Sequence, residues 1–326
     1  MRRLSHQHAS GPTNAVVSPS RSPKGVLLPA LPAIIALVLL SSPCKGQWQD
    51  SIRDYLSAPH NRLSYRELPA GKEGEVLQLI RPYLRDSSAM VRDRARTLIV
   101  ELTTRTQDAS VRMQGPELLI SAFAAQPERQ GQILAELRRY RRDDFSNVAR
   151  DSVRGWVRGA GPWLDQCMML AGFLGLADLA VTIHARTFSD SPSYLRWAAL
   201  LSNARIGKAY AVEEILQRVR KLPVNDEVVY KIFPDLLYTR QPECIAYVVD
   251  AMKSDARNCS SPNADNDTPM PCAYRIMEQL SGVIEGFPVH VDQYGDVVSG
   301  DYPTALKEAR TWLRENPAYK IVTDTY

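Results

Sequence analysis

Apolar residues recur at helical spacing in two adjacent segments near the middle of the chain. Each segment places four of them at positions i, i+3, i+4 and i+7, which line one face of an α-helix; they are Leu176, Leu179, Ala180 and Ile183, then Trp197, Leu200, Leu201 and Ala204. A Ser/Asp/Pro turn separates the segments, and Gly207 follows the second as a helix-ending residue. We therefore predict a helix hairpin over 176–207, whose apolar faces need further helices to cover them.

A second hairpin is predicted over 75–102. Its first helix, 75–85, contains Pro82, which predicts a kink because proline cannot donate the main-chain hydrogen bond of a helix. Either Asp86 or Ser87 is expected to cap the second helix. The predicted buried face of that helix consists of Val91, Ala95, Leu98 and Leu102.

The two hairpins share a spacing at the start of their second helices: Asp, four residues, an aliphatic residue, Arg, two residues, Ala. The matching positions are Asp86, Val91, Arg92 and Ala95 in one hairpin and Asp190, Leu195, Arg196 and Ala199 in the other. A partial third copy has Asp143, Val148 and Arg150, with Ser152 in place of the alanine. We interpret the Asp as a helix cap, the aliphatic residue as part of the core, and the small residue as a point of close helix contact.

This spacing resembles that of HEAT repeats, whose second helix typically starts with Asp, then Val-Arg, then Ala. The resemblance covers residues 74–255 and implies a stack of helix hairpins whose second helices line a concave surface that binds partner proteins. The copies lie 57 and then 47 residues apart, against about 40 in a regular array. Extra helices must therefore intervene, one of them around 117–124. Arg92 and Arg196 are expected to brace neighbouring repeats.

Further helical stripes continue to the end of the sequence. They lie at 52–56, 212–219, 229–236 with Pro234 inside, 245–252, 274–284 and 304–315. No segment alternates at period two for long, so no extended sheet is expected. We predict an all-α protein, an irregular α-solenoid of stacked hairpins with a C-terminal capping segment. Its expected parts are a leader (1–46), a lead-in (47–73), HEAT-like repeats (74–255) and the cap (256–326).

The net charge of +4 for the full sequence comes from the predicted leader. The leader holds five of the 40 Lys and Arg residues and no Asp or Glu, so the remaining chain has 35 basic and 36 acidic residues and a net charge near −1. Such a body has no general attraction for nucleic acid or an anionic membrane. The apolar run 26–40 follows basic residues and precedes small ones, which is typical of a cleaved signal peptide. We expect an exported protein, secreted or periplasmic, with no stable membrane insertion after cleavage; the alternative is an anchor through 26–40.

Four cysteines follow the leader: Cys167, Cys244, Cys259 and Cys272. An even number in an oxidising compartment permits two disulfides. Cys259 and Cys272 bracket a polar loop, and we predict a bond between them. Cys167 is expected to be a buried free thiol. The connectivity of Cys244 is left open, and no pair has the spacing of metal ligands.

Candidate chemistry is sparse. The sequence contains no nucleophile elbow, phosphate-binding loop or zinc-protease motif, and we predict no catalytic residue, cofactor or metal site. His290 lies near Asp292 and Asp296, a combination that could hold a metal, although we favour an ordinary loop. The basic run 138–142 is interpreted as a solvated helix face because two aspartates follow it directly.

We therefore expect a non-enzymatic exported scaffold or protein-binding module, with a protein and not a nucleic acid as its partner. The alternative is an enzyme, or a metal-binding or carbohydrate-binding module, with its site in the C-terminal loops around Asp292 and Asp296. The sequence leaves the partner's identity, the organism, the pathway and the oligomeric state open.

Overall fold

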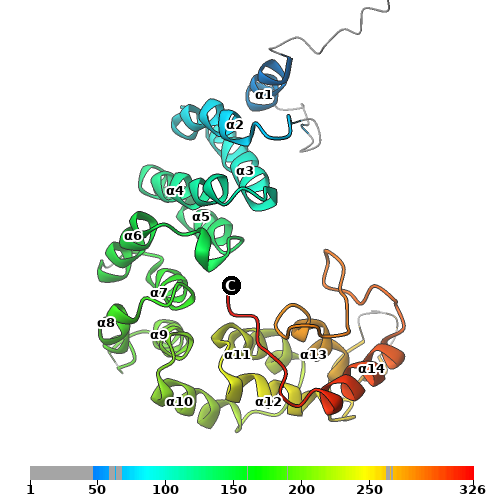
Figure 1. Cartoon of the computed structure of the whole chain (residues 1–326). Helices are drawn as coiled ribbons and strands as arrows, with labels where there is room; N and C mark the ends of the chain where they lie inside the picture. Colours follow the sequence, from blue (N-terminus) through cyan, green and yellow to red (C-terminus); the bar gives the residue numbers. More distant parts are fainter. Residues whose placement is uncertain are drawn as a thin grey trace, which may run out of the picture. The chain divides into compact units, whose positions relative to one another are not determined.

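The computed structural model describes residues 47–58, 63, 68–159, 161–188, 190–261, 265 and 267–326. The predicted leader lies outside these residues. The regular structure of the described chain is helical (Figure 1). Its α-helices are α1 (Gln47–Ser57), α2 (Glu73–Ile80), α3 (Ala89–Arg105), α4 (Ala109–Ala125), α5 (Gln130–Leu137), α6 (Asn147–Arg158), α7 (Leu164–Phe173), α8 (Ala180–His184), α9 (Ser193–Ile206), α10 (Ala209–Val219), α11 (Phe233–Thr239), α12 (Pro242–Met252), α13 (Ala273–Leu280) and α14 (Tyr302–Glu315).

Helices pack mainly against helices that are close to them in the chain. Helix α3 packs on α4, α6 on α7, and α7 on α9; α9 also contacts α10 and α11, and α11 to α14 pack in succession. One apolar core continues through this stack from Ile52 in α1 to Leu313 in α14. Each helix buries its apolar stripe against its neighbours, which is the packing of a solenoid. The predicted all-α, solenoid-like fold class is confirmed.

Proline shapes two helices. Helix α2 ends at Ile80 and continues as a 3₁₀ segment, Arg81–Arg85, so the helix type changes at Pro82, where a kink was predicted. A π-helical segment, Val228–Ile232, precedes α11, whose first turn contains Pro234. The missing N–H of each proline explains why regular α-helical bonding changes there.

The predicted Asp caps of the second helices are wrong. Helix α3 begins after Ser88, and α9 begins after Pro192. Asp86 instead closes a turn before the helix, because its Oδ1 accepts a 2.8 Å hydrogen bond from the Ser88 N–H. At α4 the cap is an aspartate: Asp108 accepts from the Ser110 N–H.

Helix α4 is longer than expected. The sequence predicted a helix over 117–124, whereas the structure has Ala109–Ala125 with Pro116 inside. The lack of a side chain at Gly115 lets this part of α4 pack against Thr103 and Tyr140, because a Cβ there would collide with their hydroxyl groups. The helix that we expected at 274–284 is shorter, since α13 ends at Leu280 and Gly282 has φ +78°.

The arginine shared by the hairpins turns back onto the loop before its own helix. Arg92 donates to the carbonyl oxygens of Asp86 (2.8 Å) and Ser87 (3.0 Å). Arg196 donates in the same way to Ser191. Arg92 also pairs with Glu128 at 2.9 Å, and so braces a later part of the stack as expected. These side chains stabilise helix starts that lack a side-chain cap.

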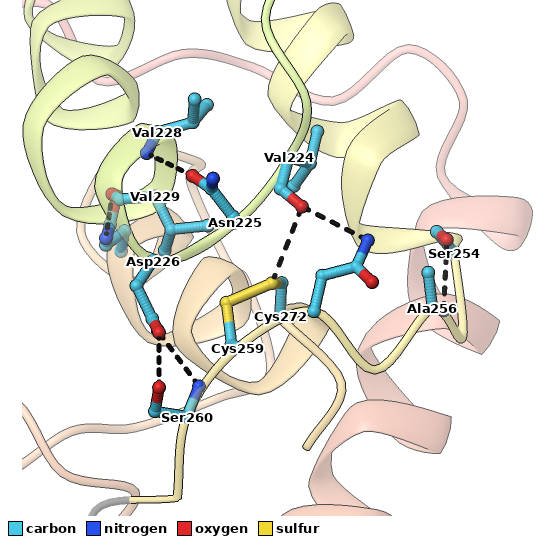
Figure 2. The surroundings of a disulfide bond; sticks show 12 residues. Val224, Asn225, Asp226, Val228, Val229, Ser254, Ala256, Cys259, Ser260 and Cys272 are labelled. Carbon is cyan, nitrogen blue, oxygen red and sulfur yellow. Dashed lines mark hydrogen bonds between the residues drawn. A yellow bond between two sulfur atoms is a disulfide. The ribbon is translucent and has the colours of Figure 1, made fainter. Parts of the chain in front are cut away.

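The predicted disulfide is present between Cys259 and Cys272 (Figure 2). Its loop rests on the segment before α11, where Asp226 accepts hydrogen bonds from the Ser260 N–H (2.9 Å) and hydroxyl (2.7 Å). A bridge that closes a loop of this size contributes about 3 kcal/mol by restricting the unfolded chain. Cys167 and Cys244 are buried free thiols, and burial raises the pKa of both.

Candidate functional site

The main chain around Asp292 and Asp296 forms a turn that the Asp292 carboxylate stabilises. Asp292 Oδ1 accepts hydrogen bonds from the N–H groups of Tyr294 (2.8 Å) and Asp296 (3.2 Å). Asp296 Oδ1 lies 3.6 Å from Arg275 Nη1, and His290 is exposed. Within the part of the chain that the structure describes, no three His, Cys, Asp or Glu side chains come together as a metal site would require. The contacts of Asp292 and Asp296 are those of a structural turn.

The basic run 138–142 is only partly the solvated face that we expected. Arg139 and Arg141 are exposed, but Tyr140 is 2% exposed and its hydroxyl lies 2.6 Å from that of Thr103. Arg138 and Arg142 are half-buried and turn toward α7. Arg142 Nε donates to the Phe173 carbonyl at 2.8 Å, and Arg138 Nη2 donates to Gln166 at 3.2 Å. The run therefore contributes to an internal surface.

The last residues of the sequence cover that surface. After α14 the chain passes the turn that follows α13, where Ile321 forms an isolated antiparallel bridge with Ile284 and the Val322 N–H donates to the Val283 carbonyl at 2.9 Å. Figure 1 shows this red end of the chain running on past α11. Residues 321–326 are called the C-terminal segment below. The surface beneath them, called the segment-binding face, consists of Arg138, Arg141, Arg142, Phe173, Arg205, Tyr238 and Arg240.

The face binds the main chain of the C-terminal segment. Arg205 Nη2 donates to the carbonyl oxygens of Thr323 (3.0 Å) and Thr325 (2.7 Å). The carbonyl between them, that of Asp324, accepts from the Arg142 N–H at 2.9 Å. Arg240 Nη2 donates to the Tyr326 carbonyl at 3.1 Å. Successive carbonyl groups thus meet donors from different parts of the chain, and the main chain bends at Asp324.

An aromatic ring anchors the end of the segment. The Tyr326 ring centroid lies 5.5 Å from that of Phe173 and 5.1 Å from that of Tyr238, and the Arg138 guanidinium lies 4.8 Å from it. Such ring and cation–π contacts contribute about 0.5–1.5 kcal/mol each beyond area burial. Burial raises the pKa of Tyr326 to about 12, and its buried Oη has no hydrogen-bond partner among the described residues.

Arg205 is buried and Arg240 is half-buried, and neither forms an ion pair among the described residues. Arg205 is 5% exposed, and burial lowers the pKa of both Arg205 and Arg240 to about 10. None of the ion pairs within the described residues involves either side chain; both are bound by carbonyl oxygens. Arg240 is also the non-glycine residue with positive φ (53°) in the described chain, a conformation that costs free energy.

The sequence did not predict this face, and its basic run was interpreted as a solvated helix surface. Arg205 and Arg240 lie more than 80 residues before their partners in the C-terminal segment, so helical periodicity cannot reveal the contact. One signal was available: Arg205 follows the apolar stripe of α9 directly, where an arginine must find buried acceptors.

A second hollow lies between α12 and α14, lined in part by Val249, Leu313, Pro317 and Tyr319. The charged groups around it are bound to their own neighbours. Arg310 donates to the Met252 carbonyl and pairs with Asp255 at 2.8 Å. This hollow offers no group that is held ready for a ligand.

Comparisons with protein-family models, curated proteins and solved structures find no match to this chain. No helix within the described residues has the length and apolar character needed to cross a membrane.

Proposed function

We propose that this protein is an exported, non-enzymatic binding module of HEAT-like architecture, and that its segment-binding face takes a segment of a partner protein. The observation that carries the proposal is the arrangement around residues 323–326. Donors from three parts of the chain bind successive carbonyl groups of one segment, and an aromatic pocket receives its last ring.

Main-chain recognition of this kind does not depend on one particular sequence. Proteins that bind extended peptides obtain affinity from main-chain hydrogen bonds and specificity from pockets for selected side chains. The five arginines of the face add positive charge around the bound segment. Export through the leader 1–46 agrees with the disulfide, because such bonds persist in oxidising compartments.

Affinity capture tests the proposal. The full chain, tagged, is used as bait in its own extracellular fraction, beside Arg141→Glu and a control, Arg218→Glu. Both arginines are exposed, but Arg141 borders the face, whereas Arg218 lies on α10 and pairs with Glu214. An exposed ion pair is worth about 0.2–1 kcal/mol, and charge reversal adds repulsion. We expect Arg141→Glu to recover at least threefold less of a partner that wild type and the control recover equally.

Equal recovery by all three baits would contradict the placement of the partner on this face. Recovery of no partner by any bait would contradict the binding function. Melting temperatures of the three purified chains show whether each bait is folded.

A further inference from the structure

We propose that the partner segment carries a carboxylate two residues before an aromatic ring, and that the chain's own C-terminal segment competes with it for the face. This inference rests on the proposed function and names the partner chemistry and the competitor. Three features of the face carry it: a register of carbonyl sites, an aromatic pocket and unpaired arginine donors.

The register fixes the conformation of the occupant. Arg205 Nη2 bonds two carbonyl groups that are two residues apart, those of Thr323 and Thr325. The main chain bends at Asp324, between these two residues, and both oxygen atoms lie within reach of one nitrogen. A partner segment must therefore present two carbonyl groups, two residues apart, to one guanidinium nitrogen.

The pocket fixes one side chain. Phe173, Tyr238 and Arg138 surround the Tyr326 ring. The Tyr326 hydroxyl has no partner there within the described residues, and an unpaired buried hydroxyl costs free energy. The pocket therefore selects an aromatic ring and gives no preference to a hydroxyl, so a phenylalanine fits as well as a tyrosine.

Charge fixes the other side chain. Asp324 Oδ2, two residues before Tyr326, lies 3.7 Å from Arg141 Nη1, at the exposed edge of the face. Deeper in the face, the Nε atoms of Arg138, Arg205 and Arg240 are buried and have no hydrogen-bond partner among the described residues. The C-terminal segment thus leaves buried cationic donors unpaired, and the positive charge of the face favours an acidic occupant.

The same burial makes the segment a competitor. Both the segment and a partner must use the Arg205 donors that now bind Thr323 and Thr325, and these donors would lose both acceptors if the face were empty. Release of the segment and entry of the partner are therefore coupled. Weakening the segment must strengthen binding of a peptide from outside.

A fluorescent peptide of residues 318–326 provides the probe. Its binding is measured by fluorescence polarisation to three full-length chains: wild type, Tyr326→Ala and, as control, Tyr294→Ala, whose tyrosine is 80% exposed and outside the face. We expect Tyr326→Ala to bind the peptide at least tenfold more tightly than wild type or the control. Circular dichroism and melting of each chain show that the helices are intact.

Three altered peptides test the partner chemistry on the Tyr326→Ala chain. The peptide with Tyr326→Phe should bind at least as tightly as the natural sequence, and the peptide with Tyr326→Ala at least tenfold more weakly. The peptide with Asp324→Asn should bind several-fold more weakly at low salt, and the difference should shrink as salt screens the exposed Arg141.

The outcomes separate the two proposals. If no chain binds the natural peptide, the proposed function at this face fails, and the inference fails with it. If wild type and Tyr326→Ala bind it equally, the face accepts peptides but the segment is no competitor, so only the inference is overturned. If the altered peptides bind like the natural one, the stated partner chemistry is wrong.

Discussion

Several charged residues near the segment-binding face lie in surroundings where burial disfavours the charged form of the side chain. Arg205 and Arg240 remain charged inside the protein because carbonyl oxygens bind them. Asp235 of α11 is bound by an indole N–H and not by carbonyl oxygens. Trp197 Nε1 donates to its Oδ2 at 2.6 Å, yet burial raises the pKa of the carboxyl group. The ionised form of Asp235 is thus less favourable in the folded protein than in the unfolded chain.

Substituting Asp235→Asn should raise the melting temperature at neutral pH. The amide oxygen can still accept from Trp197, while the buried charge is removed. Because the folded pKa of Asp235 lies above the unfolded value of about 3.9, its contribution to stability is present below pH ~4 and is lost as pH rises through the folded pKa. The advantage of Asn should therefore be absent near pH 4 and grow toward pH 7.

Thermal melts of the two chains from pH 4 to pH 7.5 measure this difference. The exposed Asp143→Asn serves as control and should change stability by less than about 0.5 kcal/mol. A variant that melts lower than wild type at pH 7 would show that the arginines of the face stabilise the Asp235 carboxylate and would contradict this account.

At the scale of elements, the sequence predicted the helices and missed their starts. The stripes of α9, α10 and α12 were found because each buries one face, and burial imposes the period of 3.6 residues. Helix starts depend on local hydrogen bonds, and several kinds of side chain and several positions can supply them. Asp86 closes a turn where a cap was expected, and the arginines of the shared spacing bond the loop carbonyl groups instead.

Helix α4 shows why a single proline misleads. The sequence predicted a helix start after Pro116, but the Asp108 cap begins the helix about two turns earlier. The Val111-Arg112 pair matches Val91-Arg92 at the start of α3, although Thr106 and Gly115 stand where the shared spacing has Asp and Ala. Tertiary contact with Tyr140 and Thr103 then keeps Gly115 and Pro116 inside the helix.

Two helical glycines give opposite predictions. Gly115→Ala should destabilise the protein by about 1–3 kcal/mol, because its Cβ meets the Thr103 and Tyr140 hydroxyl groups. Gly155→Ala in α6 should stabilise it by about 0.5–1 kcal/mol, because no atom lies within 4 Å of the added carbon.

Urea unfolding followed by circular dichroism measures both glycine variants. Equal effects of the two substitutions would mean that the packing of α4 against α3 and Tyr140 is looser than the structure has it. A stabilising Gly115→Ala would contradict the close contact directly.

At the scale of the whole molecule, the C-terminal segment was the least predictable feature. Periodicity identifies elements that bury a stripe, whereas residues 321–326 lie outside the helices and have mixed polarity. Their contacts with the face join residues 86 to 188 positions apart, from Arg240–Tyr326 to Arg138–Tyr326. The predicted cap at 256–326 accounts for the helices α13 and α14, and it did not include a return of the chain across α9 and α11.

The central claim is that the face is preformed and that the segment is a detachable occupant. Amide hydrogen exchange of wild type and Tyr326→Ala compares the two parts directly. The informative amides are those of Val322 and Arg142, which donate to Val283 and Asp324, and that of Cys167 inside α7.

We predict that Tyr326→Ala lowers the protection of Val322 and Arg142 at least tenfold and leaves Cys167 and the other amides of α7 and α9 as in wild type. Loss of protection throughout α7 and α9 would show that the segment is part of the core, and unchanged protection at Arg142 would show that the Tyr326 ring does not hold it. Either result would contradict the account.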